Sequence, residues 1–426
     1  MVRRGEPLEH HENLIAFVTK RNMISKKPSI LFISWDGPQT NYLENLFFPI
    51  FSGLTEWHFH VIQFSWAGKE KQEHLKALAS HLGIHYSHVD VIRRPHPLLG
   101  TVATILRGIP QLKSYVREHR IDVLMPRSTF PAMIAGVLQK KMPHLKLVFD
   151  ADGLPLEERV DFSGLDPKGF QYRFLKKQER QTLLLADRVL VRSDHAARIH
   201  LQHIGERHSG KFFKVTNGRD KDFFSVDLVS RTAFRKKLGL AEGQLLLVYT
   251  GSLGPQYGWE EMAGIFEELL MWRSDSKLLI LSGNPAFLQN KVPAAIADKV
   301  IVKEGPFNEV PAWLSAADIA LAIRKPLPSM KGVAPIKLGE YLLMGLPTIA
   351  SQGIGDSEAL LGGLPFVYHF DHDRVRETKG AAAWVKEQKA VDKESIRQFA
   401  LRHFTLDKSI MDYRQALDGL IKTDEA

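Results

Sequence analysis

Two side chains three residues apart, Lys337 and Glu340, have the types and the spacing that could bind a charged ligand. They lie in the stretch APIKLGEYLLMGLPTIAS, in which Pro335 suits the first turn of a helix and Gly345 suits its end. Residues three apart on a helix share a face, and the start of a helix favours anions. An ionised glutamate accepts hydrogen bonds from vicinal hydroxyls. The pair therefore suits a phosphate and a ribose, although the spacing by itself fits a weak surface ion pair equally well.

Glycine-bearing turns in the second half of the chain point to the same kind of ligand. YTGSLGPQYG places Gly251, Ser252 and Gly254 after a strand-like run, and SQGIGDSE places Gly353 and Gly355 after another. Small residues let backbone amides approach a phosphate closely. The chain has no complete G-x-G-x-x-G and no P-loop lysine at these turns. Together with the start of the Lys337 helix, the turns favour a phosphate-containing ligand.

Charged side chains also follow three strand-like runs in the first half. Asp36 and Gly37 follow SILFIS, Arg127 follows IDVLMP, and Asp150 ends the run LKLVFD, which Asp152 follows. The carboxyl ends of parallel strands lie at one edge of a sheet, where open α/β sheets bind ligands. Each residue has an ordinary alternative role, as a turn former or a solvated loop residue. Their coincidence at one sheet edge favours a functional site.

Short apolar runs must form the strands that position these residues. Their almost continuous apolar character is typical of parallel strands covered by helices on both faces. The runs of the first half are SILFIS, HFHVIQF, IDVLMP, LKLVFD and DRVLVRS, and those of the second half are LLLVYTG, KLLILSG, KVIVKE, DIALAIR, LPTIAS and PFVYHF. Stretches with helical periodicity separate them. The sequence therefore predicts an α/β fold with two tandem Rossmann-like, doubly wound domains that face each other across a cleft.

The pattern also predicts where the domains begin and end. We expect an N-terminal extension over 1–27, a first domain over 28–215, a second domain over 216–400, and a C-terminal helix over 401–426 that could pack on either domain.

Composition limits the possible partners and cofactors. The 57 basic and 48 acidic residues give a formal net charge of +9. Such an excess favours a phosphate-bearing ligand, an anionic membrane surface or nucleic acid, and no basic run interleaved with aromatic residues supports nucleic acid. The absence of cysteine excludes a thiolate nucleophile or ligand, and the 18 histidines show no metal-ligand spacing. We therefore expect no metal cofactor.

The first 27 residues are predicted to be neither a membrane span nor a secretory signal. No stretch of the chain approaches the roughly 20 apolar residues that a span requires, and the leader lacks the continuous apolar core of a signal peptide. A cytoplasmic location is the resulting expectation. Arg3, Arg4, Lys26 and Lys27 flank apolar residues, so the leader suits either a plain surface extension or an amphipathic helix on an anionic membrane.

From residue 28 to about Leu420 the chain resembles the retaining glycosyltransferases of family four, which have the two-domain GT-B fold. PIKLGEYLLMGLPTIAS is similar to the donor-site signature of that family. TNGRDKDFF is similar to its PNGVDxxxF, YTGSLG to its first donor-domain turn, and VFDADGLPLEERVD to the FDMRGFWADERVD of a subgroup. The resemblance implies transfer of a sugar, with retention of configuration, from a UDP- or GDP-sugar to a saccharide or a lipid-linked acceptor. Cell-surface polysaccharide or glycolipid synthesis is the process that it implies.

The resemblance also implies that the first domain faces the acceptor, that the second domain binds the nucleotide-sugar donor, and that the candidate residues have corresponding roles. The residues implied to take part in catalysis are Arg127, Lys337 and Glu340. The residues implied to bind the donor are Gly251, Ser252, Gly254, Tyr257, Arg324, Lys337, Glu340, Gly353 and Gly355, with Glu340 on the ribose. The residues implied to face the acceptor are Asp36, Gly37, Gln39, Asp150, Asp152 and Glu158.

The chain departs from the family pattern at several of these positions. Gly332 stands where the family has a first glutamate, Ser252 and Tyr257 stand where it has an arginine and a lysine, and Asp152 stands where the subgroup has an arginine. Lys337 and Arg324 are expected to supply the missing positive charge. Two alternatives stay open: a sugar-nucleotide epimerase on the same fold, and a non-catalytic protein that binds nucleotide sugars.

Overall fold

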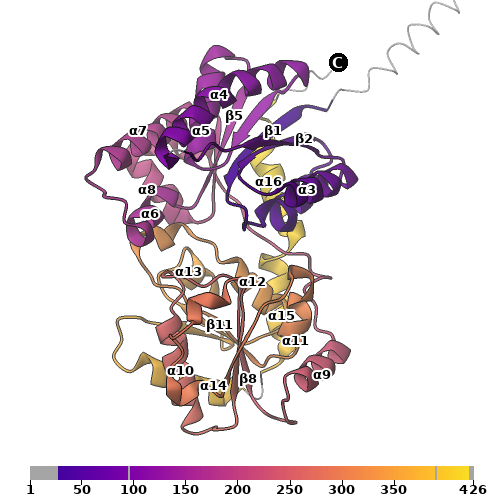
Figure 1. Cartoon of the computed structure of the whole chain (residues 1–426), viewed down its shortest axis with the longest axis vertical. Coiled ribbons are helices and arrows are strands. Elements are labelled where there is room, and N and C mark those ends of the chain that lie inside the picture. Colours follow the sequence, from indigo (N-terminus) through magenta and orange to yellow (C-terminus); the bar gives the residue numbers. More distant parts are fainter. Residues whose placement is uncertain (1–26, 95, 389–390, 422–426) are drawn as a thin grey trace, which may run out of the picture.

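Two parallel β-sheets, one in each of two α/β domains, make up the fold of the computed structural model (Figure 1). The structure describes residues 27–94, 96–388 and 391–421. Most of the expected N-terminal extension, residues 1–26, therefore lies outside the described residues. The predicted fold class, two tandem doubly wound domains, is confirmed.

The first sheet has seven strands in the order β3-β2-β1-β4-β5-β6-β7. Its strands are β1 (Ser29–Asp36), β2 (His58–Ser65), β3 (His85–Asp90), β4 (Val123–Pro126), β5 (Lys146–Asp152), β6 (Arg188–Val191) and β7 (Phe212–Lys214). The helical segments between them are η1 (Leu43–Phe47), α2 (Phe48–Gly53), α3 (Lys69–His81), α4 (Pro97–Glu118), α5 (Thr129–Lys141), α6 (Pro155–Ser163), α7 (Phe170–Leu185), α8 (Asp194–Ile204) and η2 (Glu206–Lys211).

The second sheet has six strands in the order β10-β9-β8-β11-β12-β13. Its strands are β8 (Leu246–Thr250), β9 (Lys277–Leu281), β10 (Val300–Lys303), β11 (Ile319–Ala322), β12 (Thr348–Ser351) and β13 (Val367–Phe370). The longer helices are α9 (Leu228–Lys237), α10 (Trp259–Leu270), α11 (Val310–Ser315), α12 (Ile336–Leu343), α13 (Ser357–Leu361), α14 (Glu377–Glu387), α15 (Lys393–His403) and α16 (Leu406–Leu417). Single helical turns form η3 (Pro285–Leu288), η4 (Ala294–Ile296), η5 (Phe307–Glu309) and η6 (Pro328–Gly332).

Apolar runs predicted eleven of these strands, and the two that they did not predict lie at the edges of the first sheet. β3 has the sequence HYSHVD and is only half-buried, and β7 has three residues, none of them fully buried. An edge strand has a neighbour on one side only, so it needs less apolar surface than a central strand. The hydrophobic pattern of such strands is correspondingly weak.

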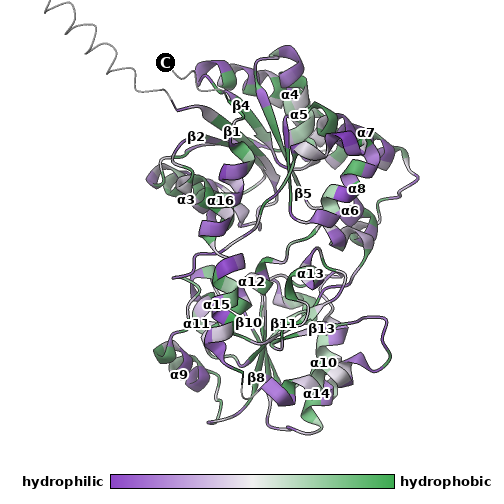
Figure 2. Ribbon diagram, turned by 180° about the vertical axis from the view of Figure 1, so that it is seen from behind, coloured by the Kyte–Doolittle hydropathy of each residue, from purple (hydrophilic) through white to green (hydrophobic). Residues whose placement is uncertain are grey.

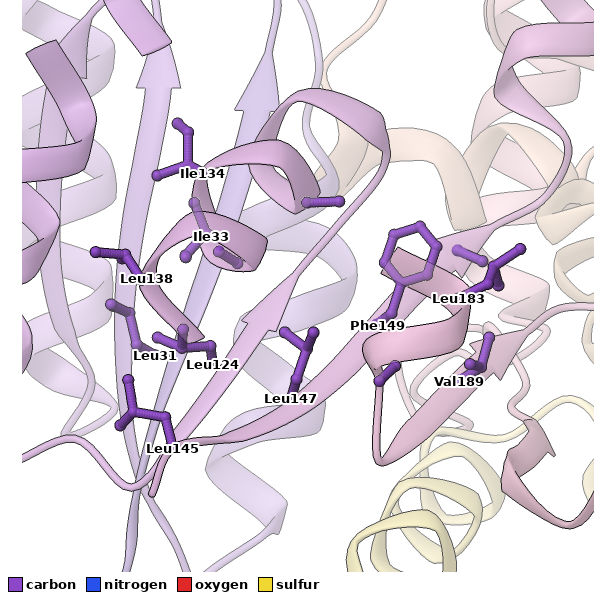
Figure 3. Close-up of a cluster of buried hydrophobic side chains, with 14 of the residues drawn as sticks. Leu31, Ile33, Leu124, Ile134, Leu138, Leu145, Leu147, Phe149, Leu183 and Val189 are labelled. Atoms are coloured by element: carbon purple, nitrogen blue, oxygen red, sulfur yellow. The ribbon is translucent and has the colours of Figure 1, made fainter. Parts of the chain in front are cut away.

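Each sheet is covered on both faces by helices, and the buried side chains form two cores per domain. Hydrophobic colouring concentrates in the strands, whereas the helices show mixed colouring (Figure 2). Figure 3 shows one core, in which Ile134 and Leu138 of α5 lie over Leu31 and Ile33 of β1. This burial holds the carboxyl ends of the strands, and the loops that follow them, in fixed positions.

The last helix, α16, packs against the first domain (Figure 1, yellow). Tyr413 and Leu417 are fully buried in the same core as Phe32 of β1. Gly53 of α2 makes the close approach possible, because a Cβ at that position would lie 2.2 Å from Cδ1 of Ile410. The chain therefore passes from the first domain to the second and then returns.

Candidate functional site

A cavity of about 420 Å³ lies between the two domains and is lined by residues from both. The order of strands along the chain reverses between β1 and β4 in the first sheet and between β8 and β11 in the second. Ligands of doubly wound sheets bind beyond the carboxyl ends of the strands at such reversals. Arg127 after β4, Ser252 after β8 and Arg324 after β11 all line the cavity.

Helix α12 presents Lys337 and Glu340 to this cavity. The ammonium of Lys337 lies 4.0 Å from the ring centroid of Tyr249 and 4.2 Å from that of Tyr257, and it donates a hydrogen bond to the Tyr249 hydroxyl. Gly251 leaves room for this side chain, because a Cβ there would lie 2.6 Å from Cε of Lys337. The positive φ of 110° at this residue also favours glycine.

In the ligand-free protein, the surroundings of Lys337 disfavour the charged form of its side chain. Burial lowers the pKa of Lys337 well below its usual range, the neighbouring guanidinium of Arg324 lowers it further, and Glu340 offsets only part of this. Arg324 itself lies 4.8 Å from the Tyr257 ring, so the tyrosine separates the two cations. An anion in this part of the cavity would relieve the repulsion between them.

Glu340 is buried and is paired with Arg219, a residue from the loop that follows β7. Nε of Arg219 donates to Oε1 of Glu340 at 2.7 Å, and its Nη1 donates to the carbonyl oxygen of Asn45 in the first domain. The guanidinium also lies 5.3 Å from the Phe307 ring centroid. Arg219 therefore links the glutamate of α12 to the other domain and leaves Oε2 of Glu340 available to a ligand.

Arg127 lines the cavity on the side of the first domain. Its Nη2 donates to Oδ2 of Asp152 at 2.6 Å, and its Nη1 lies 4.0 Å from Oδ1 of Asp36. Burial by itself would lower its pKa, but the surrounding carboxylates of Asp152, Asp150 and Asp36 raise the pKa above its usual value. The guanidinium also lies 4.9 Å from the Tyr42 ring. Arg127 is therefore held as a permanent cation in a fixed orientation.

Asp152 lies between two arginines in an unfavourable backbone conformation. Its φ is +62°, which a residue with a side chain seldom adopts. Its Oδ1 lies 3.9 Å from Nε of Arg192, in addition to the contact of Oδ2 with Arg127. Strain of this kind persists where the surroundings fix it, and it is frequent at functional sites.

The structure does not bring every predicted site residue to the cavity. Those that line it are Gln39, Arg127, Asp152, Glu158, Gly251, Ser252, Tyr257, Arg324, Lys337 and Glu340. Those that do not are Asp36, Gly37, Asp150, Gly254, Gly353 and Gly355. Asp36 and Asp150 are buried beneath the cavity, where Asp36 accepts hydrogen bonds from Ser34 and Gln63, and Asp150 accepts one from Arg192.

The turn with Gly353 and Gly355 serves a structural purpose, which corrects the expected phosphate-binding role of its amides. The Gly353 amide donates to the carboxylate of Glu358, and the Gly355 amide donates to the Met330 carbonyl oxygen. A Cβ at Gly355 would lie 2.0 Å from the carbonyl oxygen of Val333. These contacts leave neither amide free for a ligand.

Gly332, which stands where the resembling family has a glutamate, is a contact between the domains. A Cβ at this residue would lie 2.8 Å from Cγ and from the backbone nitrogen of Leu154, and a Cβ at Gly153 would lie 2.9 Å from the Gly332 carbonyl oxygen. A larger side chain would push the domains apart at this point. The departure from the family pattern is therefore explained by close packing of the backbones.

Several residues of the cavity were missed by the sequence reasoning. Arg219, Asn45, Tyr42 and Phe307 all line it. The signal for Arg219 was present, because this arginine stands at the valine of the PNGVD motif. Nothing in the local sequence singled out the other three, which approach the cavity through the packing of distant loops. No group of three or more His, Cys, Asp or Glu side chains that could hold a metal ion occurs in the described part of the chain.

Comparisons with known proteins identify the fold but not the activity. No family model matches the sequence, and no curated protein does. Among solved structures, HepE of Anabaena in complex with UDP-glucose has a TM-score of 0.66 at 14% identity and covers 92% of this chain and 99% of its own. WaaG, a glycosyltransferase involved in lipopolysaccharide biosynthesis, has a TM-score of 0.65 at 17% identity over 92% of this chain and all of its own (100%).

A third similar structure is a putative UDP-N-acetylglucosamine 2-epimerase from Listeria monocytogenes, with a TM-score of 0.56 at 14% identity over 91% of this chain and 94% of its own. The chain therefore has the two-domain GT-B fold. At such low identity the likeness establishes the fold alone.

Proposed function

We propose that this chain is a glycosyltransferase that transfers a sugar from a nucleoside diphosphate sugar, most readily a UDP- or GDP-sugar, to a saccharide or lipid-linked acceptor. The observation that carries the proposal is the position of Lys337 and Glu340, on the first turns of α12, opposite Arg127 across one cavity. The UDP-glucose in the complex of HepE, which has the same fold, supports a nucleotide sugar as the co-substrate. We place the activity in the cytoplasm, in the assembly of a surface polysaccharide or glycolipid.

The donor would lie mainly on the second domain. The start of α12, Lys337 and Arg324 form the cationic part of the cavity and suit the diphosphate. The free carboxylate oxygen of Glu340 suits the ribose hydroxyls. The Phe307 ring, beyond Arg219, offers an apolar surface for the base.

The chemistry would rely on these side chains and not on a protein nucleophile. The bond between the anomeric carbon and the phosphate oxygen breaks, and the negative charge that develops on the diphosphate is stabilised by Lys337, Arg324 and the α12 amides. The acceptor oxygen forms its new bond on the same face of the sugar, which retains the configuration. Its proton passes to the departing phosphate. Asp152 is tied to Arg127 and would orient the acceptor or the transferred sugar.

Titration calorimetry with UDP-, GDP- and ADP-sugars tests the donor site. We expect one class to bind and Glu340→Gln to weaken binding by about tenfold or more, the equivalent of roughly 1.4 kcal/mol. Glu260→Gln is the matched control, because this carboxylate is exposed on α10 and does not line the cavity. Binding of no nucleotide sugar, or equal binding by the Glu340 variant, would contradict the proposal.

Two alternatives are separated by following the products. An epimerase, which the Listeria structure makes a specific candidate, would convert the donor without an acceptor, so NMR of the donor incubated alone detects it. A non-catalytic protein, suggested by Ser252 and Tyr257 in place of the family cations, would bind the donor and transfer nothing. The proposed reaction is supported if the wild type transfers the sugar and the product keeps the anomeric configuration of the donor. Lys337→Met should abolish this transfer.

A further inference from the structure

Helix α4 has an apolar face on each of two sides, and only the inner one packs against the protein. Its inner face buries Ile105, Leu112 and Val116 against the first sheet and α5. Gly108 allows the close contact, since a Cβ there would lie 3.0 Å from the ring of Phe64. The packing of this inner face is sufficient to hold α4 against the first domain.

The outer face of α4 is apolar over its first turns. The exposed aliphatic residues are Leu98 (51% exposed), Leu99 (64%), Val102 (55%) and Leu106 (64%). Spacings of three and four residues put Leu99, Val102 and Leu106 on one side of the helix. A helix on the surface of a soluble domain normally has polar residues there. Contiguous exposed apolar surface of this kind marks a contact with another partner.

Positive charge surrounds this apolar stripe. Between residues 91 and 117 the chain has the basic residues Arg93, Arg94, Arg107, Lys113 and Arg117 and no acidic residue. Arg93 and Arg94 are exposed just before the stripe, and Arg107 is exposed directly after it. A bilayer that contains anionic lipids has an apolar interior and negatively charged headgroups. An apolar stripe that is flanked by arginines and lacks acidic residues is complementary to such a surface.

Trp66 extends the same surface toward the cavity between the domains. This residue follows β2, is partly exposed, and has the guanidinium of Arg93 at 4.6 Å from its ring centroid. Its ring lies 3.5 Å from the position that a Cβ on Gly37 would occupy, two residues before Gln39 of the cavity. Tryptophan with an adjacent arginine is favoured at membrane–water interfaces.

We propose that the outer face of α4, together with Trp66 and the arginines beside it, binds the surface of a bilayer that contains anionic lipids. Binding of this kind needs no spanning segment, and no helix in the described ranges is long and apolar enough to cross a membrane. Helix α4 lies in the part of the first domain that is away from the second domain (Figure 1). The inference is independent of the proposed transferase activity.

Flotation of the full-length protein with lipid vesicles tests the proposal. The vesicles are phosphatidylcholine alone or with about one third phosphatidylglycerol. The wild type is expected to float with the anionic vesicles. The variant with Leu98→Ser, Leu99→Ser, Val102→Ser and Leu106→Ser is expected to bind them about tenfold more weakly, since four apolar side chains are lost. Arg94→Gln with Arg107→Gln is expected to weaken binding most at low salt.

Two further variants and one measurement make the outcome decisive. Leu228→Ser with Val229→Ser removes apolar side chains from α9 that are even more exposed than those of α4, and this variant should float like the wild type. Leu14→Ser with Phe17→Ser, in the N-terminal leader, should do the same. Circular dichroism confirms that each variant is folded. The proposal is overturned if the wild type does not float, if only the leader variant loses binding, or if the α4 variant floats normally.

A self-association role for α4 would give a different result. Light scattering would then show the wild type as a dimer that the α4 variant converts to a monomer, without binding of the wild type to vesicles. That outcome also overturns the proposal.

Discussion

Arg219 occupies a position where the resembling family has an apolar residue, and its surroundings explain what the change does. It neutralises Glu340, which is almost completely buried, and it reaches the Asn45 carbonyl oxygen of the opposite domain. A buried carboxylate without a partner is costly. Arg219 therefore acts through Glu340, as a residue that positions the carboxylate for a ligand.

Arg219→Leu is predicted to destabilise the protein by roughly 3 kcal/mol, because Glu340 is left buried and unpaired. Urea unfolding measures this loss. Adding Glu340→Gln should recover part of it, since the two residues interact directly. The control is Lys221→Leu, in the same loop. The ion pair of Lys221 with Asp407 is exposed, so this variant should leave the stability almost unchanged. If Arg219→Leu and Lys221→Leu destabilise the protein equally, the role assigned to Arg219 is wrong.

Lys337 is predicted to take up a proton when a diphosphate binds. Its pKa is lowered in the free protein, first by burial and then by Arg324. An anion beside the ammonium raises that pKa, so binding is accompanied by protonation at any pH between the free and the bound pKa, and affinity falls as the pH rises through that range. Calorimetry in buffers of different ionisation enthalpy measures the uptake. Lys337→Met should show none, and Lys325→Met, whose side chain is more exposed, should match the wild type. Absence of uptake in the wild type would refute this assignment.

At the scale of elements, α16 shows how an element far along the chain completes a core that begins near residue 29. Leu417 and Tyr413 fill space between α2 and the first sheet. The hydroxyl of Tyr413 also accepts a hydrogen bond from Arg192, which in turn holds Asp150. The last helix therefore supports the strand β5 whose end carries Asp152.

Leu417→Ala is predicted to lower the free energy of unfolding by about 2–5 kcal/mol, through lost burial and the cavity that remains. Met411→Ala, on the exposed side of the same helix, should change it by less than about 0.5 kcal/mol. Chemical denaturation followed by tryptophan fluorescence gives both values. A small effect at Leu417 would mean that α16 is not part of the first-domain core.

At the scale of the whole molecule, Asp356 connects the two domains. It belongs to the second domain, yet its carboxylate accepts hydrogen bonds from the backbone of Asp194 and from the Lys214 ammonium. Burial acts to raise its pKa, but these bonds and the one from His195 lower it overall. A carboxylate from one domain thus caps helix α8 of the other.

Asp356→Asn is predicted to loosen the contact between the domains, because the amide cannot replace the charged contact with Lys214. Small-angle X-ray scattering of the ligand-free protein should show a larger radius of gyration. Asp298→Asn, at an exposed position, is the control and should leave the scattering curve unchanged. Identical curves for the wild type and Asp356→Asn would show that this contact does not hold the domains together.

The sequence by itself determined the fold class, the central strands and the helix that carries Lys337 and Glu340, because each depends on the local spacing of apolar, proline and glycine residues. It could not determine which charged side chains form ion pairs with one another. Arg219 and Glu340 are 121 positions apart, and Asp150 and Arg192 are 42 apart. Whether Asp150 is buried while Asp152 faces the cavity, and whether Tyr257 separates two cations, was decided only when sheets and loops packed together. Contacts between distant segments depend on tertiary packing, for which a single sequence carries no periodic signal.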